Sequence, residues 1–403
     1  MRARTLFLGL AAVLVAATCT AAAGPAVAAP RGFVAAGLAR QAPSPGGPAP
    51  AVVEGLTDFG YQLSRRTADP DGNWAMSPLS IAYAFAMARA GAGGETAAQL
   101  DRLFHFPPDG TGEAFNALDR RLAPDGGPLR IANALWTQPG LPIGEPFLRT
   151  LATQYGTGVR TVDFRSPGAK DAIDAWVREQ TDGRIRELFD RLDPDTKAVL
   201  ANAIYFKAAW RLPFESTDPG ASFTRPDGST VTAPMMNRAA SLGYAEGPGW
   251  RAVELPYKTG DYAMWVLLPE PSGGAPVDLL APDVLAEVGK GLRPAYVDMS
   301  MPKWEFDTGF DLLGAMRDLG FTDVGDFSGI NPDVFLGEAV HRATITVDEV
   351  GTEAAAVTGL AFPTSAGPRP DVTFRADRPF AFAIVHTPTR TPAFIGTVTD
   401  PTA

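Results

Sequence analysis

The positions of apolar residues along the chain predict helices in its first half. Apolar side chains recur every three or four residues over 52–66, as in an amphipathic helix with one face on a core. Residues 78–89 are apolar on nearly every face and follow Ser77, a suitable N-cap, so we expect a helix buried inside the protein. Thr96 and Gln99 have the spacing of a capping box and predict the start of a third helix.

The second half of the chain reads mainly as strands. Residues 198–210 are mostly apolar without interruption, which is typical of a central strand buried on both faces. Further strands are expected at 129–138, 262–270, 295–306, 380–388 and 392–401, and further helices at 169–185 and 310–321. Because strands and helices do not alternate regularly, the pattern predicts an α+β fold, and no linker divides residues 51–403.

The N-terminal fifty residues differ from the rest. A basic start (MRAR), an apolar run (LFLGLAAVLVAA) and small residues at 26–28 are the parts of a secretory signal peptide that is cleaved after Ala28. We therefore expect a secreted, extracellular protein. Cys19, the one cysteine of the chain, is an alternative site for a lipid anchor. Residues 29–50 are mostly Ala, Gly and Pro and predict a flexible linker.

Charge and motifs exclude several functions. The formal net charge of −10 argues against sequence-independent binding to nucleic acid or to an anionic membrane. The chain has three histidines and no pattern of a zinc site, a P-loop or a nucleophile elbow. Its 45 acidic residues offer no carboxylate pair that stands out. The sequence therefore points to no enzyme and to no cofactor.

A stretch near the C-terminus, VDEVGTEAAAVTGLAFPTSAGPRP at 347–370, suits both a loop and a strand. From Ala354 to Pro368 it contains no charged side chain, although exposed loops usually carry charge. Its Gly, Pro, Ser and Thr residues are typical of loops, whereas the run of three alanines contains no turn residue. A simple Ala-rich linker is the structural alternative.

Several motifs carry a resemblance to a known family. They are NWAMSPLSIAYAFAMARAGAGGETAAQL, LANAIYFKAAWRLPF, MPKWEF, AVHRATITVDEVGTEAAAVT and RPFAFAIVHTPTRTPAFIGTVTDP. In this order, over about 51–401, the chain resembles the serpins, a family of serine protease inhibitors. The resemblance implies the serpin fold, with three β-sheets, eight or nine helices and an exposed reactive-centre loop at about 349–370. Insertion of that loop into the central sheet is a known case of strand addition.

The resemblance also implies roles for particular residues. The hinge of the loop would comprise Glu349, Gly351, Thr352, Ala354, Ala355, Ala356 and Thr358. The bond cleaved by a protease would join Ser365 to Ala366, with the bonds on either side as alternatives. A polar cluster behind the sheet, the shutter, would comprise Ser80, Asn202 and His341. The point where the loop first enters, the breach, would comprise Trp210, Lys303 and Glu349.

An ion pair between Lys303 and Glu349 is expected at the breach. If it is partly buried, breaking it would cost up to a few kcal/mol. If it is a surface pair, it would contribute less than about 1 kcal/mol.

The resemblance implies a partner and leaves alternatives. Small residues around Ser365 suit a serine protease with a small primary pocket, such as an elastase-like or subtilisin-like enzyme. Only Arg120 and Arg121 form a basic pair after the third helix, so no glycosaminoglycan is expected, and the chain is expected to be a monomer. The alternatives are a serpin fold that binds or is cleaved without inhibiting, and an inhibitor of cysteine proteases. The alanines at 354–356 favour inhibition.

Overall fold

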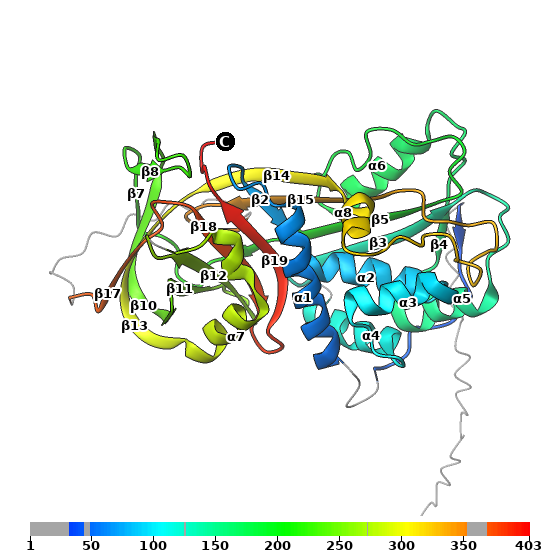
Figure 1. Ribbon diagram of the computed structural model, residues 1–403, viewed down its shortest axis with the longest axis horizontal. Coiled ribbons are helices and arrows are strands. Elements are labelled where there is room, and N and C mark those ends of the chain that lie inside the picture. Colours follow the sequence, from blue (N-terminus) through cyan, green and yellow to red (C-terminus); the bar gives the residue numbers. More distant parts are fainter. Residues whose placement is uncertain (1–31, 44–48, 125, 272, 353–368) are drawn as a thin grey trace, which may run out of the picture. The chain divides into compact units, whose positions relative to one another are not determined.

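The computed structural model describes residues 32–43, 49–124, 126–271, 273–352 and 369–403, which form a mixed α+β fold (Figure 1). Within these ranges there are three sheets and eight α-helices, as expected. The helices are α1 (Ala49–Thr67), α2 (Pro78–Arg89), α3 (Gly94–Phe104), α4 (Thr111–Leu122), α5 (Glu145–Thr150), α6 (Ala169–Gln180), α7 (Pro282–Gly291) and α8 (Leu312–Asp318). None of these helices is long and apolar enough to cross a membrane.

The central sheet has eight strands and contains the candidate site. Its strands, in spatial order, are β1 (Phe33–Val34), β4 (Val159–Thr161), β3 (Leu129–Thr137), β5 (Ala198–Phe206), β15 (Ala339–Val347), β16 (Gly351–Thr352) and β6 (Ala208–Ala209). Strand β14 (Trp304–Asp311) pairs with β15 on the side away from this path. Strand β5 is antiparallel to β3 and parallel to β15. The short β16 is antiparallel to both β15 and β6.

The second sheet has nine strands, and the third has two. The nine are β17 (Val372–Arg375), β13 (Arg293–Pro302), β10 (Met235–Gly247), β11 (Trp250–Pro256), β12 (Tyr262–Pro269), β18 (Phe380–His386), β19 (Thr391–Val398), β2 (Trp74–Met76) and β7 (Ser216–Asp218). The small sheet is the hairpin of β8 (Ser222–Thr224) and β9 (Thr230–Thr232). Its turn contains Pro226, Asp227 and Gly228, and Gly228 has a φ of 81° that favours glycine.

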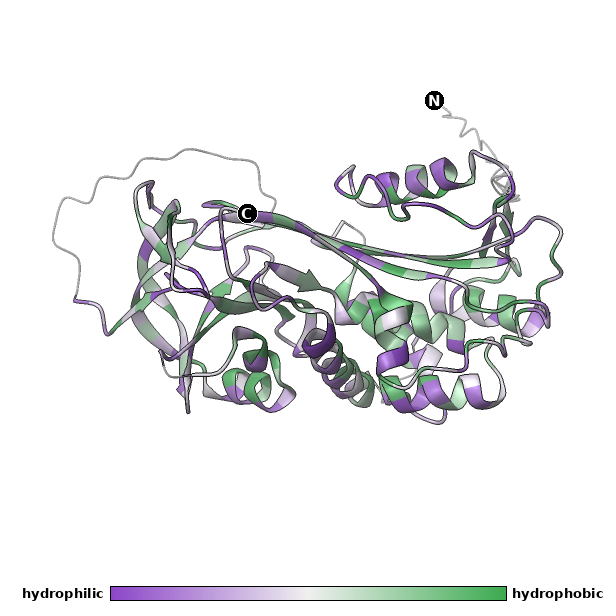
Figure 2. Cartoon of the chain, turned by 45° about the horizontal axis from the view of Figure 1, so that its top comes forward, coloured by the Kyte–Doolittle hydropathy of each residue, from purple (hydrophilic) through white to green (hydrophobic). Residues whose placement is uncertain are grey.

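Strand β5 is buried on both faces, as its apolar sequence predicts. Val199, Ala201 and Ala203 pack in a cluster with α6. The alternate residues Leu200 and Ile204 belong to the main core, which contains α2. Helices α2 and α6 lie on opposite faces of the central sheet (Figures 1 and 2), and Figure 2 shows hydrophobic residues along its strands. Packing on both faces fixes β5, and with it any polar side chain that β5 carries.

The predicted buried helix is confirmed, but the predicted capping box is wrong. In α2 every residue from Pro78 to Ala88 is buried, and the Ser77 side chain accepts the N–H of Ser80 as an N-cap. Helix α3 begins at Gly94, before the predicted box. Thr96 and Gln99 instead bond to the segment 322–326. Thr96 and Gln99 therefore have the spacing of a capping box, but they bind a distant segment and do not cap the helix.

Residues 32–43 differ from the flexible linker expected at 29–50. Strand β1 pairs with β4, and the N–H of Gln41 bonds to the carbonyl of Thr153 at 2.8 Å. Arg40 forms an ion pair with Asp119 at 2.6 Å. The folded part thus begins at Gly32 and not at residue 51, because a few polar and aromatic residues among the small ones have specific partners. The predicted signal peptide, with Cys19, lies outside the described ranges.

Candidate functional site: the breach and the shutter of the central sheet

The short strand β16 occupies one end of the central sheet, between β15 and β6. Thr352 is opposite Val347 of β15 and Ala208 of β6. Gly351 lies so close to β6 that a Cβ atom there would be 2.2 Å from the carbonyl oxygen of Ala208. Only glycine can take this position without a shift of backbone. The first residues of the predicted hinge therefore already form part of the sheet.

A tight turn leads from β15 into β16. In this turn, the side-chain oxygen Oδ1 of Asp348 accepts hydrogen bonds from the backbone N–H groups of Val350 and Gly351, at 2.8 and 2.9 Å. The indole N–H of Trp210 donates to the carbonyl of Asp348 at 2.9 Å, and the backbone N–H of Trp210 donates to the carbonyl of Val350 at 2.8 Å. Trp210, expected at the breach, therefore holds the start of the predicted hinge by two hydrogen bonds.

Thr352 is the first residue of the predicted hinge whose side chain faces the core. It is 1% exposed, and its hydroxyl lies 2.6 Å from the hydroxyl of Tyr257. Burial raises the pKa of Tyr257 far above its ordinary value, so this phenol stays neutral. Tyr257 also stacks on Trp210, with ring centroids 4.5 Å apart. Sequence reasoning missed Tyr257, because nothing in its local pattern indicates a contact with a residue 95 positions away.

The expected ion pair at the breach is present. Lys303 Nζ lies 3.0 Å from Glu349 Oε1, which also accepts the hydroxyl of Thr217 at 2.6 Å. Burial alone would raise the pKa of the Glu349 carboxyl, but hydrogen bonds from Thr217 and Lys303 outweigh it and hold this pKa below its ordinary value. The Lys303 and Glu349 side chains are 41% and 31% exposed, so solvent screens the pair. The structure therefore favours the smaller of the two expected energies.

The three shutter residues meet in the core, although they are far apart in sequence. Ser80, Asn202 and His341 are all buried, at 0%, 2% and 0% exposure. The Asn202 amide nitrogen donates to the hydroxyl and the carbonyl of Ser80, at 2.6 and 2.7 Å. It also lies 2.6 Å from the Asn133 side-chain oxygen. Asn133 was not foreseen; it is directly opposite Asn202 in the ladder between β3 and β5.

The hydrogen bonds of His341 define its proton. The backbone N–H of Ser77 donates to Nε2 at 3.2 Å, so this nitrogen carries no proton. The proton therefore resides on Nδ1, which donates to the side-chain oxygen of Asn202 at 3.1 Å. Burial lowers the pKa of His341 to about 3, so the ring is neutral at physiological pH.

The shutter marks the place where β5 and β15 are in contact. The two strands pair at residues 200–202 and 339–341, and His341 is opposite Asn202. Within the described part of the chain, no ladder pair links residues 342–346 of β15 to β5. At the far end of this interval, β16 lies between β15 and β6. We call this interval the lane, because an additional strand that continues β16 would run along it.

The remaining predicted residues lie outside the described ranges. These are Ala354, Ala355, Ala356, Thr358, Ser365 and Ala366. Among the residues that the structure does describe, no group of histidine, cysteine and acidic side chains could hold a metal ion.

Comparisons with known proteins agree with this geometry. A family model described as serpin (serine protease inhibitor) matches residues 54–401. An uncharacterized serpin-like protein of Thermococcus kodakarensis is 35% identical, covering 87% of this chain and 86% of its own. The leukocyte elastase inhibitor of Bos taurus is 34% identical, covering 83% of this chain and 94% of its own.

Solved structures give the same result. The thermophilic serpin tengpin, in its native state, superposes with a TM-score of 0.78 at 26% identity, over 86% of this chain and 94% of its own. Thyroxine-binding globulin in complex with thyroxine superposes with a TM-score of 0.78 at 28% identity, over 87% of this chain and 99% of its own. The chain therefore belongs to the serpin family.

Proposed function

We propose that this serpin is a secreted suicide-substrate inhibitor of serine endopeptidases and not an enzyme. The observation that carries the proposal is strand β16, which seats Gly351 and Thr352 at the end of the lane in the register of an additional strand. A protein that only displayed its loop would not need Gly351 packed against the backbone of β6. The pairing of Gly351 and Thr352 with the central sheet supports insertion of the loop as the step that inhibits the protease.

The sequence after Thr352 fits a strand in the lane. If the register of β16 continued, Ala354, Ala356 and Thr358 would be opposite Ile345, Ala343 and His341, whose side chains are buried. Small side chains can enter such a face without displacing the core. Between Thr352 and Pro363 the sequence contains no proline, so no ladder hydrogen bond would be lost over the first residues to insert.

The proposed chemistry is an interrupted peptide hydrolysis. The protease serine Oγ attacks the carbonyl carbon of Ser365, the bond to Ala366 breaks, and the new amine leaves on the C-terminal fragment with the proton that the protease base supplies. The protease then remains attached to Ser365 through an ester. If the freed segment enters the lane before water hydrolyses this ester, the protease is carried away and distorted. Inhibition is thus a race between insertion and deacylation.

The proposed target is a serine protease with a small primary pocket. Ser365 and Ala366 are small, and relatives of this chain include inhibitors named for leukocyte elastase. Secretion, with cleavage after Ala28, rests on the signal-peptide pattern, and a lipid anchor at Cys19 is the alternative. N-terminal sequencing and mass measurement of the protein released by its producing cells would separate the two.

The proposal is tested by incubating the full mature chain with elastase-like and subtilisin-like proteases. We expect a protease complex that survives SDS, and a released C-terminal peptide that begins at Ala366 by mass spectrometry. In the variant Thr352→Arg a charged side chain must enter the buried site beside Tyr257, so we expect cleavage without trapping. Cleavage without any complex across a panel that includes cysteine proteases would refute inhibition and favour the non-inhibitory alternative.

A further inference from the structure

One aromatic side chain is exposed near the end of the central sheet that is farther from β16. Phe335 lies just before β15 and is 49% exposed, the largest value among the large apolar side chains that the structure describes. Val34 and Leu38, the other two that are exposed, belong to the N-terminal segment 32–43. A single exposed apolar side chain is common. The case for Phe335 therefore rests on what holds the ring outside and on what would reach it.

The backbone on either side of Phe335 is fixed. Its neighbours Val334 and Leu336 are buried, at 3% and 5% exposure. The N–H of Val334 donates to the carbonyl of Asn331, and the N–H of Leu336 donates to the carbonyl of Val324, both at 3.0 Å. Because both neighbours point into the core, the side chain between them points outward.

The ring of Phe335 also has no space into which it could withdraw. The hollow that it lines together with Ala198, Leu200 and Ile330 has a volume of about 10 Å³. Such a hollow has room for one water molecule at most, whereas an aromatic ring needs far more. The exposure of Phe335 is therefore built into the fold.

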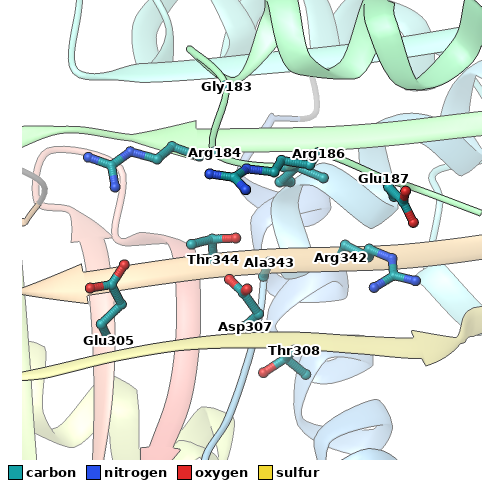
Figure 3. Close-up of a pocket in the computed structure, with 11 residues that line it drawn as sticks. Gly183, Arg184, Arg186, Glu187, Glu305, Asp307, Thr308, Arg342, Ala343 and Thr344 are labelled. Atoms are coloured by element: carbon teal, nitrogen blue, oxygen red, sulfur yellow. The ribbon is translucent and has the colours of Figure 1, made fainter. Parts of the chain in front are cut away.

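The sheet surface farther along the lane is different in character. Figure 3 shows a cavity of about 400 Å³ between residues 183–187 and the strands β14 and β15. Most of the side chains that line it are charged: Arg184, Arg186, Glu187, Glu305, Asp307 and Arg342. Covering charged groups with an apolar surface costs free energy. An apolar partner surface is therefore disfavoured there and is better received at Phe335.

The register of the proposed insertion leads to Phe335. Thr352 is already paired with β15 in an antiparallel register. If this register continued residue by residue, Thr364 would reach the level of Phe335. Ser365, which carries the protease in the proposed function, is the next residue. A strand of thirteen residues from Thr352 spans about 43 Å, so the protease would arrive beside Phe335, at the far end of the lane.

A protease that arrives there has an apolar surface to offer. In the proposed function it is distorted, and a protein that loses its native packing exposes apolar side chains that are otherwise buried. Aromatic side chains are frequent anchors at protein interfaces. A contact that only the distorted protease can make stabilises that state relative to the active one.

We propose that Phe335 is an apolar anchor for the trapped protease, and that its contact with the distorted protease slows hydrolysis of the ester at Ser365. In that hydrolysis water adds to the carbonyl carbon of Ser365 and the ester bond breaks. The protease serine oxygen leaves with one proton, and Ser365 keeps a carboxylate whose proton goes to solvent. The protease catalyses this step only with a restored active site, which the anchor disfavours. The inference rests on the proposed function and adds a residue that prolongs the complex.

The test compares Phe335→Ser with the unchanged full mature chain. Each is reacted with the same elastase-like or subtilisin-like protease, and the purified complex is followed for the return of protease activity and for the mass of a released chain that ends at Ser365. We expect release about tenfold faster from Phe335→Ser, the effect of losing one interface anchor. The rate of complex formation should be unchanged, because Phe335 lies far from β16. Phe335→Leu, which keeps an apolar side chain, should be intermediate.

A matched control removes a similarly exposed apolar side chain elsewhere. Leu38 is 43% exposed and follows β1, which β4 and β3 separate from β5 and the lane. Leu38→Ser should release the protease within twofold of the unchanged rate, and neither serine variant should change the melting temperature of the native chain. Equal acceleration by both variants would overturn the proposal. So would a Phe335→Ser variant that melts earlier and forms the complex more slowly but releases the protease at the unchanged rate.

A spectroscopic variant reports the contact itself. In Phe335→Trp the fluorescence of the added indole is obtained as the difference between the variant and the unchanged chain. On formation of the complex this emission should shift to shorter wavelength, as for an indole that leaves water, and it should return after the protease is released. An emission that stays at the wavelength of the free variant would show that nothing covers this position, and would overturn the proposal.

The outcomes separate the anchor from the proposed function. If the unchanged chain forms a complex that survives SDS and Phe335→Ser releases the protease within twofold of the unchanged rate, the anchor is refuted while inhibition stands. If the unchanged chain is cleaved and forms no complex with any protease, inhibition is refuted and the anchor with it.

Discussion

Protonation of His341 should make the native state acid-sensitive. In the native chain His341 is fully buried and its pKa is lowered to about 3, whereas the ordinary value is 6.5. Between these two values the unfolded chain binds a proton that the native chain does not. The free energy of unfolding therefore decreases as the pH falls below about 6.5, and the contribution of His341 is fully retained above that value.

The magnitude follows from the same two values. Each unit of pKa difference corresponds to about 1.4 kcal/mol, so at about pH 4.5, two units below the unfolded pKa, the native state loses about 3 kcal/mol. Native domains are stable by only about 5–15 kcal/mol, so this loss is a large fraction of the total. The physical reason is that a second ring proton would leave the N–H of Ser77 without its acceptor, inside the core.

The assay is urea unfolding at about pH 7.5 and pH 4.5 of the unchanged chain and of His341→Gln. Glutamine should destabilise at both pH values because it disturbs the shutter, but it removes the titration. The stability difference between the two proteins should therefore shrink by about 3 kcal/mol at the lower pH. Burial also lowers the pKa of His386, which both proteins retain, so its effect cancels. Equal pH dependence of the two proteins would refute the reasoning.

Two further substitutions test contacts of different burial. Lys303→Ala should destabilise the native state by less than about 1 kcal/mol, and about 1 M salt should abolish the difference, because the pair with Glu349 is screened by solvent; a larger or salt-independent loss in urea unfolding would contradict this. Arg40→Ala should destabilise by about 1–3 kcal/mol, because it leaves the mostly buried Asp119 without its ion-pair partner and removes one of the contacts that hold residues 32–43. An unchanged melting temperature by differential scanning calorimetry would show that this ion pair contributes nothing.

Sequence reasoning predicted the secondary structure where burial leaves a clear pattern of apolar residues in the sequence. The uniformly apolar residues of α2 and β5 could be interpreted directly, because an element packed on all sides has no polar face. The capping box failed for the opposite reason. Thr96 and Gln99 satisfy backbone groups of the segment 322–326, and a contact of this kind leaves no mark in the spacing of either partner.

The candidate site could be foreseen only in part. The resemblance brought together Ser80, Asn202 and His341, and the structure places all three in one hydrogen-bonded cluster. Tyr257, which directly follows β11, and Asn133 of β3 complete these contacts but were missed, because nothing in the local sequence marks either residue as a partner of a distant segment. Residues 32–43 were missed because the average composition of a segment hides the few side chains that dock it.

The seating of Gly351 and Thr352 has a kinetic consequence. Adding a strand is slowest at its first ladder pair, when a long loop must be closed before any neighbouring contact compensates for the lost chain entropy. In this chain that nucleus exists before a protease arrives, with Thr352 already paired on both sides. In the proposed insertion, each later residue would only extend a ladder that already exists. If the proposed insertion occurs, its slowest step must therefore come after this first ladder pair.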